Sequence, residues 1–281
     1  MNRRRAAAGR IRIGIGGWNY APWRGSFYPP GLAQRRELEY ASRRLGSIEI
    51  NGTYYGSQKP ESFARWRDET PDDFVFAVKA PRYATNRRAL AEAGPTIERF
   101  FASGVMELGD KLGPINWQLL PTKSFDPDDF GAFLELLPAS VDGRELRHAV
   151  EVRHESFRSP AFVELARARG VAIVLSADGS HPQIADPSAS FVYARIMGTR
   201  EGEETGYPAH ELDLWARRAE ALATGAMPED LDFVGPPSRT AAARDVFLYV
   251  IGGHKVSNPR AAISLQERLG KRHRPAGQRG G

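Results

Sequence analysis

Short runs of β-branched and aromatic residues alternate along the chain with longer stretches in which apolar residues recur at helical spacing. The strand-like runs are eight in number and cover residues 11–15, 47–51, 73–79, 114–119, 148–153, 171–176, 191–196 and 245–251. The helix-like stretches cover residues 33–45, 60–68, 95–109, 128–137, 159–169, 209–224 and 258–269. This alternation predicts successive β/α units whose strands run parallel in one sheet.

Eight is the number of parallel strands that closes a β/α barrel. An open, doubly wound sheet is the alternative, and its usual sign is a glycine-rich dinucleotide fingerprint after the first strand. Here the first strand ends in Gly14-Ile15-Gly16-Gly17, which lacks the third glycine at the required spacing, and Trp18-Asn19-Tyr20 does not open a helix. We therefore predict an α/β fold with a single (β/α)8 TIM-type barrel. The proline-containing stretches 177–190 and 225–240 predict loops.

The basic residues gather at the two ends of the chain. The 281 residues include 39 Lys plus Arg and 34 Asp plus Glu, which gives a formal net charge of +5 and a pI near 9.5. Residues 1–10 and 271–281 hold eight of the basic residues and no acidic one, so the remainder has 31 basic and 34 acidic residues, a net charge of −3. We predict a mildly acidic barrel domain over residues 11–270 between two short disordered basic tails. A nucleic acid would then bind only weakly, through the tails.

Composition and local motifs exclude several classes of protein. Hydrophobic residues make up 41% and charged residues 26%, as in ordinary globular proteins. The absence of cysteine excludes disulfides, thiolate nucleophiles and cysteine-ligated metals. No apolar window is long enough to span a membrane, and the Ala6-Ala7-Ala8 run is too short for the core of a signal peptide, so we expect a soluble cytoplasmic protein. No nucleophile elbow, P-loop or His-Glu-x-x-His motif occurs.

Polar residues occur at the carboxyl ends of the predicted strands, where the active site of a β/α barrel is built. Glu49 and Asn51 share a face of the second strand, as Glu151 and Arg153 do on the fifth. We expect a pocket whose candidate catalytic residues are Glu49, Lys79 and Glu151. The candidate substrate-binding residues are Asn51, Tyr54, Gln118, Arg153, Asp178 and Arg195.

Lys79 closes an apolar strand and is one of only six lysines in the chain. In a partly desolvated pocket its pKa would fall, which suits a Schiff base, a proton shuttle or an anion anchor. The alternative is an ordinary cation at the barrel mouth, paired with Glu49 or Glu151 in a structural network.

Glu49 and Glu151 lie on strands at opposite sides of the predicted barrel, so their carboxyl groups could face each other as an acid and a base. The alternative is a neutral network in which Arg153 holds Glu151 and Lys79 holds Glu49. No organic cofactor is predicted. A divalent metal held by Glu151, Asp178 and His154 or His181 is a weaker possibility, because His154 is out of register with Glu151. Arg153, Arg195 and Lys79 could instead receive a phosphate or carboxylate.

The stretch 18–30 is unusually aromatic for a first loop: it reads Trp-Asn-Tyr-Ala-Pro-Trp-Arg-Gly-Ser-Phe-Tyr-Pro-Pro. It could form the floor of a ligand pocket. We favour the alternative that it packs as a plug on one side of the barrel, joined by Tyr54 and Tyr55.

Several motifs together resemble a known bacterial family. They are Trp18-Asn19-Tyr20 with Trp23-Arg24-Gly25 and Phe27-Tyr28-Pro29, Ile48 to Tyr55, Phe76 to Arg82, Lys111 to Pro114 with Gln118, Val150 to His154, and Tyr193-Ala194-Arg195. In this order they are similar to the YecE-like family, a domain of unknown function, over residues 11–270. The resemblance implies a β/α barrel with a pocket at the strand ends and no particular reaction. The chain departs from the family pattern at Asn86, at Met197 and at Gly252-Gly253, so that two histidines of the pattern are absent.

We therefore expect an enzyme that acts on a small polar or anionic metabolite, as a hydrolase, lyase or isomerase. Lys79, Arg153 and Arg195 formally balance Glu49, Glu151 and Asp178, which favours a small polar ligand over a polyanion. A nucleic-acid-associated protein and a non-catalytic ligand-binding barrel are the alternatives. The substrate, the presence of a metal and the oligomeric state stay open at this point.

Overall fold

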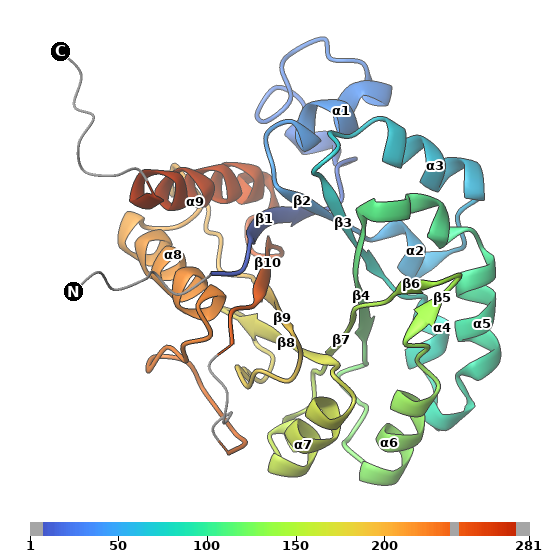
Figure 1. Ribbon diagram of the computed structural model, residues 1–281. Coiled ribbons are helices and arrows are strands. Elements are labelled where there is room, and N and C mark those ends of the chain that lie inside the picture. The colour runs from blue at the N-terminus through green and yellow to red at the C-terminus, as the bar shows by residue number, and fades with distance from the viewer. Residues whose placement is uncertain (1–7, 237–241, 274–281) are drawn as a thin grey trace, which may run out of the picture.

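A closed barrel forms the centre of the computed structural model, which describes residues 8–236 and 242–273 (Figure 1). Within these ranges eight parallel strands are hydrogen-bonded in the order β1-β10-β9-β8-β7-β4-β3-β2. They are β1 (Ile11–Gly16), β2 (Ser47–Ile50), β3 (Val75–Lys79), β4 (Leu112–Gln118), β7 (His148–Glu151), β8 (Ala172–Ala177), β9 (Phe191–Ile196) and β10 (Asp245–Val250). Each matches one predicted run, and the predicted TIM-type barrel is confirmed.

Helices surround the barrel as an outer layer (Figure 1). The longer ones are α1 (Glu37–Ser42), α3 (Pro60–Asp68), α5 (Gly94–Ala102), α6 (Pro127–Glu135), α7 (Pro160–Ala168), α8 (Ala209–Ala223) and α9 (Asn258–His273). Two four-residue helices, α2 (Gly52–Tyr55) and α4 (Arg82–Thr85), follow β2 and β3 directly and were not predicted. They are too short to show a helical period in the sequence.

The predicted helix over residues 95–109 is two elements. After α5 the chain turns at Gly104, whose φ is +95°, and continues as a 3-10 helix, Val105–Lys111. A Cβ at this position would lie 2.7 Å from Pro60, so only glycine allows the turn to approach the start of α3 this closely. Similarly, the first part of the predicted helix 33–45 is a 3-10 turn, Gln34–Arg36, ahead of α1.

Three helices, α6, α7 and α9, start where a proline follows Asp, Ser or Asn, a local sequence that favours a helix start. Asp126 caps α6, because its carboxylate accepts hydrogen bonds from the main-chain nitrogens of Asp128 and Asp129. Ser159, before α7, makes no such bond. The side chain of Asn258 accepts instead from the hydroxyl of Thr199, so it ties the start of α9 to the loop after β9.

Two elements outside the barrel complete the fold. The strands β5 (Ser140–Val141) and β6 (Arg144–Glu145) pair as an antiparallel hairpin. Asp142 and Gly143 form its turn with φ of 50° and 76°, as a two-residue hairpin turn requires. This hairpin was not predicted, because two-residue strands are too short to show alternation. The expected loop 177–190 and the described part of loop 225–240 hold no further helix or strand.

The barrel interior changes character along its axis. Early positions in the strands contribute an apolar cluster that includes Ala149, Ala172, Phe191 and Phe247. The last two positions of five strands contribute Glu49, Lys79, Gln118, Glu151 and Arg195 instead. Since side chains alternate between barrel and helix layer, this change places charged groups at the carboxyl-terminal mouth.

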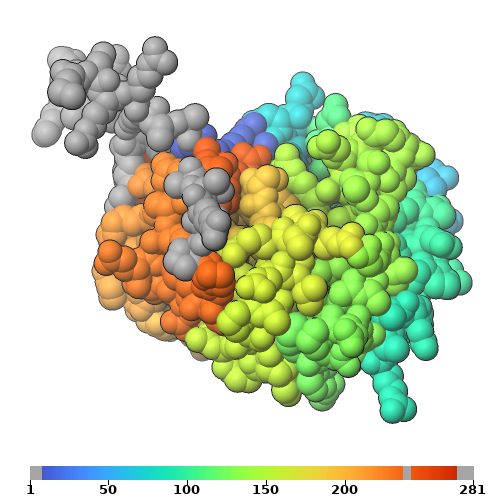
Figure 2. Space-filling model, turned by 60° about the horizontal axis from the view of Figure 1, so that its bottom comes forward, coloured from blue at the N-terminus to red at the C-terminus, as the bar shows by residue number. Residues whose placement is uncertain are grey.

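The two ends of the described chain lie side by side, and Figure 2 shows blue residues of the N-terminal part beside orange-red residues of the C-terminal part, as the pairing of β1 with β10 requires. The side chain of Arg10 pairs with Asp73 and its main-chain nitrogen donates to Asp245, while α9 continues to His273. The other arginines of the predicted tails that lie in residues 1–7 and 274–281 are outside the described residues. In the described part of the chain, no helix has the length and apolar character needed to cross a membrane.

Candidate active site

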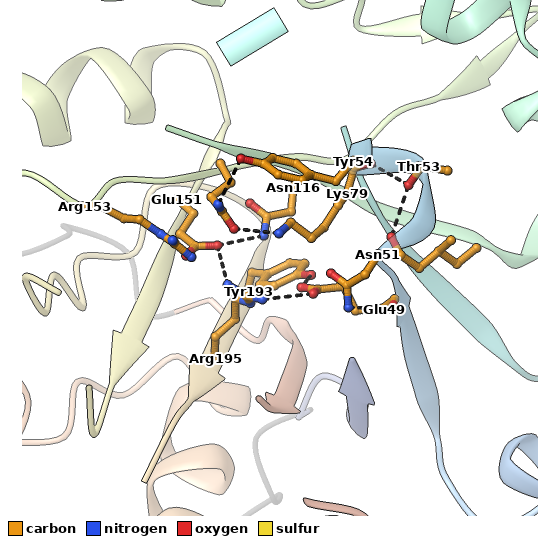
Figure 3. A network of polar contacts seen from close by, with 12 residues as sticks. Glu49, Asn51, Thr53, Tyr54, Lys79, Asn116, Glu151, Arg153, Tyr193 and Arg195 are labelled. Atoms are coloured by element: carbon orange, nitrogen blue, oxygen red, sulfur yellow. Dashed lines mark hydrogen bonds and ion pairs between the residues drawn. The ribbon is translucent and has the colours of Figure 1, made fainter. Parts of the chain in front are cut away.

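Six of the predicted site residues meet at the centre of the barrel mouth (Figure 3). They come from the carboxyl ends of β2, β3, β4, β7 and β9: Glu49, Lys79, Gln118, Glu151, Arg153 and Arg195. All but Arg153 are buried. The strand ends therefore do bring these residues together, as parallel register requires.

Arg195 holds both glutamates at once. Its Nη1 donates to Glu151 Oε2 at 2.6 Å, and its Nη2 donates to Glu49 Oε1 at 3.1 Å. The two glutamates have no exposed surface, and Arg195 is 3% exposed. A guanidinium fork suits this bridging role, and a buried carboxylate needs such a partner because an unpaired charge in the interior is costly.

Additional donors satisfy the remaining carboxylate oxygens. Arg153 donates to Glu151 Oε1 from Nε at 2.9 Å and from Nη2 at 2.7 Å, and Asn116 Nδ2 donates to Glu151 Oε2 at 3.2 Å. The hydroxyl of Tyr193 donates to Glu49 Oε2 at 2.5 Å. Burial alone would raise the pKa of Glu151, but Arg195, Arg153 and Lys79 outweigh burial and lower it to about 2. Glu151 is therefore ionised at neutral pH, and neither glutamate lines the cavity described below.

Lys79 has neutral partners instead of a carboxylate. Its Nζ donates to Gln118 Oε1 at 2.6 Å and lies 4.2 Å from the ring centre of Tyr54. Among the described residues Nζ forms no ion pair, because Arg195 and Arg153 occupy the glutamates that could have held it. Burial lowers the pKa of Lys79 to about 8; Glu49 opposes this change and Arg195 adds to it. The predicted pairing of Lys79 with Glu49 or Glu151 is not what the structure shows.

A cavity of about 500 Å³ opens at the mouth between the ends of β1, β2, β3 and β10. Its charged lining residues are Lys79, Arg195 and Lys255, and none of the described residues that line it is acidic. Asn19, Asn51 and Asn258 add amide groups. Position 16 has no space for a side chain, since a Cβ there would lie 2.8 Å from Asn51 Nδ2. Glycine therefore allows the end of β1 and the side chain of Asn51 to lie together in the cavity wall.

The aromatic segment 18–30 is partly a plug and partly a cavity wall. Trp23, Phe27 and Tyr28 are buried, and Trp23 Nε1 donates to the main-chain oxygen of Lys255 at 2.9 Å. Packing of this part agrees with the interpretation favoured above. Trp18 and Tyr20, however, line the cavity, and the Nζ of Lys255 lies 4.1 Å from the ring centre of Tyr20.

Asn51 and Tyr54, two further candidate binding residues, differ in their surroundings. Asn51 lines the cavity, and its Nδ2 donates to the main-chain oxygen of Glu49 at 3.4 Å. Tyr54 lies against Lys79, and its hydroxyl accepts from Gln118 Nε2 at 3.4 Å. Thr53 donates to the main-chain oxygen of Lys79 at 2.7 Å and so holds the end of β3. Tyr54 therefore shapes the surroundings of the amine.

Asp178 is not part of the assembled group. Its Oδ2 accepts from the hydroxyl of Tyr207 at 3.0 Å and from Trp215 Nε1 at 2.9 Å, and its φ is +59°. These contacts join the end of β8 to α8. The set of metal ligands considered from the sequence also does not form, since Glu151 is held by arginines and His154 bonds to Ser156. Within residues 8–236 and 242–273, no three His, Asp or Glu side chains form a group that could hold a metal ion.

Two members of the buried network were missed in the sequence. Asn116 lies two positions before Gln118, and Tyr193 lies two positions before Arg195, so each shares the interior face of its strand. That spacing could have identified them. Lys255 and Asn258 are not among the candidates predicted from the sequence, because nothing in their local sequence shows that the chain folds them over the mouth.

Comparison with known proteins agrees with this architecture. A family model described as "Protein of unknown function DUF72" matches residues 12–279. The chain belongs to this family. The resemblance recognised in the sequence is thus confirmed: the "UPF0759 protein YecE" of Escherichia coli (strain K12) is 31% identical over 164 residues, which cover 57% of this chain and 55% of that protein. The "UPF0759 protein YunF" of Bacillus subtilis (strain 168) is 26% identical over 159 residues, or 55% of this chain and 54% of that protein.

The barrel is shared with DUF72 proteins of known structure. The crystal structure of a DUF72 family protein from Thermotoga maritima has a TM-score of 0.70 and 20% identity, and the match covers 93% of this chain and 99% of that chain. This likeness shows the common fold. In contrast, the chain spans only about half the length of the two curated relatives in the sequence alignments.

Proposed function

We propose that this DUF72 protein is an enzyme that binds a small anionic metabolite in the cavity at the barrel mouth, with Lys79 as the reacting group. One observation carries the proposal. The cavity is lined by Lys79, Arg195 and Lys255, while Glu49 and Glu151 are already held by arginine below it. A ligand in the cavity therefore meets positive charge that no lining carboxylate offsets.

The three cationic side chains that line the cavity differ in how they can interact with a ligand. Arg195 donates a hydrogen bond to each glutamate from its two terminal nitrogens, so its main effect is to hold Glu49 and Glu151 in place. Lys255, at the outer wall over Tyr20, forms no ion pair with any described residue. Its position suits an anchor for a carboxylate or phosphate, with the neighbouring amides as hydrogen-bonding groups.

Lys79 is better placed for chemistry than the two glutamates. A general acid and base pair needs one carboxyl group that keeps its proton near neutral pH, whereas the pKa of Glu151 is about 2. Both glutamates are also shielded from the cavity by their own partners. We assign them the role of balancing the arginines that surround the amine, rather than the acid and base roles expected from the sequence.

Binding of small anions tests the proposal. Wild-type protein is titrated with pyruvate, glycerol 3-phosphate and inorganic phosphate, and with glycerol as the neutral control, by calorimetry and by the shift in unfolding temperature. We expect stabilisation by the anions and not by glycerol, and a loss of affinity of about tenfold in Lys255→Met. The matched control is Lys59→Met, which removes an exposed lysine outside the cavity.

Turnover separates an enzyme from a ligand-binding barrel. Anions that bind are incubated with wild-type protein and with Lys79→Met, and consumption is followed by NMR. Consumption by wild type alone supports the assignment of Lys79. Anion binding that is equal in wild type and Lys255→Met, or absent in both, would overturn the proposed pocket.

A further inference from the structure

The surroundings of Lys79 also favour one class of substrate. We propose that the Nζ of Lys79 forms an imine with the carbonyl carbon of a small anionic aldehyde or ketone held in the cavity. This inference rests on the proposed function, because it uses the same pocket. It adds a covalent step and a substrate class, namely a carbonyl compound that carries a carboxylate or a phosphate.

The contacts of Lys79 leave its nitrogen available. An amine held by a carboxylate is kept protonated, but the only described hydrogen-bond partner of this Nζ is the neutral oxygen of Gln118. Its other close neighbour is the ring of Tyr54. Lys79 is 6% exposed and still lines the cavity, so the amine is desolvated and reachable at one end of the pocket.

Burial and the nearby charges also favour the unprotonated form of the Lys79 amine. Burial and the neighbouring Arg195 lower the pKa of Lys79 to about 8, although Glu49 opposes them. About one tenth of the amine is then unprotonated at pH 7, compared with less than about one thousandth for an ordinary lysine. An adjacent cation and a desolvated pocket are the two means by which lysine nucleophiles are activated.

Lys255 lines the same cavity as Lys79 and favours an anionic ligand. Lys255 follows β10, while Lys79 ends β3, and both line the same cavity of about 500 Å³. A ligand that carries both groups can therefore lie with its acidic group toward Lys255 and its carbonyl toward Lys79. Such positioning makes attack intramolecular in effect, which raises its rate relative to reaction at any exposed lysine.

The step balances without an oxidant or reductant. The lone pair of Nζ attacks the carbonyl carbon, a C–N bond forms, and the carbonyl oxygen takes a proton that leaves the nitrogen, giving a carbinolamine. The carbinolamine then loses its hydroxyl group as water, using the second proton of the nitrogen, as the C=N bond forms. The sum is amine plus carbonyl giving imine plus water.

Trapping by cyanoborohydride tests this step, since it reduces an imine to a stable secondary amine. The protein is incubated at pH 7 with pyruvate or with glyceraldehyde 3-phosphate, and with acetone and glyceraldehyde as the matched neutral carbonyl compounds. Peptide mass spectrometry then locates the adduct. With only six lysines in the chain, each site can be assigned, and exposed Lys59 serves as the internal control.

We expect an adduct on Lys79 that exceeds the adduct on Lys59 by more than about tenfold for at least one anionic probe. The two probes distinguish a carboxylate ligand from a phosphate ligand. The neutral compounds and Lys255→Met should each reduce the yield. Lys79→Arg should abolish the adduct while retaining anion binding, and Lys79→Met serves as a second variant if the arginine variant does not fold.

Two failures can be told apart. If pyruvate or glyceraldehyde 3-phosphate binds in the calorimeter but Lys79 is labelled no faster than Lys59, the imine is wrong and the anion pocket stands. If neither probe labels Lys79 and none of the anions binds, glycerol 3-phosphate and inorganic phosphate included, both the imine and the proposed function are wrong. Labelling of Lys79 that is equally strong with the neutral compounds would overturn the anionic substrate class.

Discussion

Arg195 and Glu151 are joined across the mouth of the barrel by a hydrogen bond of 2.6 Å from Nη1 to Oε2, although their strands, β9 and β7, are separated by β8. The same guanidinium reaches Glu49 from the other side. This bridge occupies the two carboxylates that would otherwise pair with Lys79. As a result, the amines of Lys79 and Lys255 form no ion pair within the described site, and we expect the chemistry to depend on lysine and not on the carboxylates.

Replacement of Arg195 should strongly destabilise the fold. Arg195→Met leaves Glu49 and Glu151 buried with fewer partners, and breaking a buried ion pair costs about 3–5 kcal/mol. The free energy of unfolding, from urea denaturation at pH 7, measures the loss. Arg36→Ala breaks the exposed pair with Glu39 and should leave stability unchanged within error. A loss for Arg195→Met below about 1 kcal/mol would mean that the network does not support the barrel.

His148 should make the protein sensitive to mild acid. Its Nδ1 accepts from Trp117 Nε1 at 3.0 Å and its Nε2 bonds to the main-chain oxygen of Pro138 at 2.8 Å, so the neutral ring fits the site. Burial lowers the pKa of His148 to about 4, although the bond to Pro138 opposes this. The folded-state pKa lies below the unfolded value of about 6.5, so the stabilisation is complete above pH 6.5 and is lost as the pH falls toward 4.

The difference in unfolding free energy between wild type and His148→Asn isolates this effect from other titrating groups. We expect the difference to shrink between pH 7 and pH 4 by about 3 kcal/mol. His154→Asn, which changes a histidine whose contact is local to Ser156, is the matched control. A difference that does not vary with pH would contradict the assignment of a neutral His148.

The amine of Lys79 should titrate well below the reference pKa of a lysine side chain. Competitive labelling with trace acetic anhydride across the alkaline range reports the unprotonated fraction of each lysine. Since burial lowers the pKa of Lys79 to about 8, its labelling midpoint should lie near pH 8, well below the reference lysine value of about 10.4. A Lys79 midpoint near the reference lysine value would remove the electrostatic support for Lys79 as a nucleophile.

Asp178 should matter for stability and not for ligand binding. Each hydrogen bond to a charged group contributes about 1.5–3 kcal/mol, and Asp178 accepts two, from Tyr207 and Trp215. Asp178→Ala should cost about 3 kcal/mol, because it removes both bonds and places alanine at a positive φ. Asp178→Asn, which tolerates that backbone conformation, should cost less.

The same two Asp178 variants are then titrated with the anions used for the wild-type protein. Affinities equal to wild type, at a temperature where the variants are folded, would show that Asp178 acts in the fold. A tenfold loss of affinity in Asp178→Asn would restore it to the binding residues.

Local patterns were sufficient for the barrel and for most of its polar centre. Eight apolar runs of strand length and the helical stretches between them specified parallel β/α units, because each pattern depends only on which faces of nearby residues must be buried. Strand ends then identified Glu49, Lys79, Gln118, Glu151, Arg153 and Arg195, since parallel strands of one barrel end at the same mouth. Short elements such as α2, α4 and the β5–β6 hairpin were not predicted, because each helix or strand spans little more than one period of its pattern.

Partner choice within that centre was decided only by the tertiary structure. From the sequence, Glu49 could pair with Lys79 or with Arg195 equally well, because charge alone does not distinguish them. The closed barrel sets the distances: it brings Arg195 between the two glutamates and turns Lys79 toward Gln118. The tertiary structure likewise places Lys255 at the cavity and Asp178 against α8. Contacts between residues far apart in the chain depend on the register of the whole barrel, and no local pattern specifies that register.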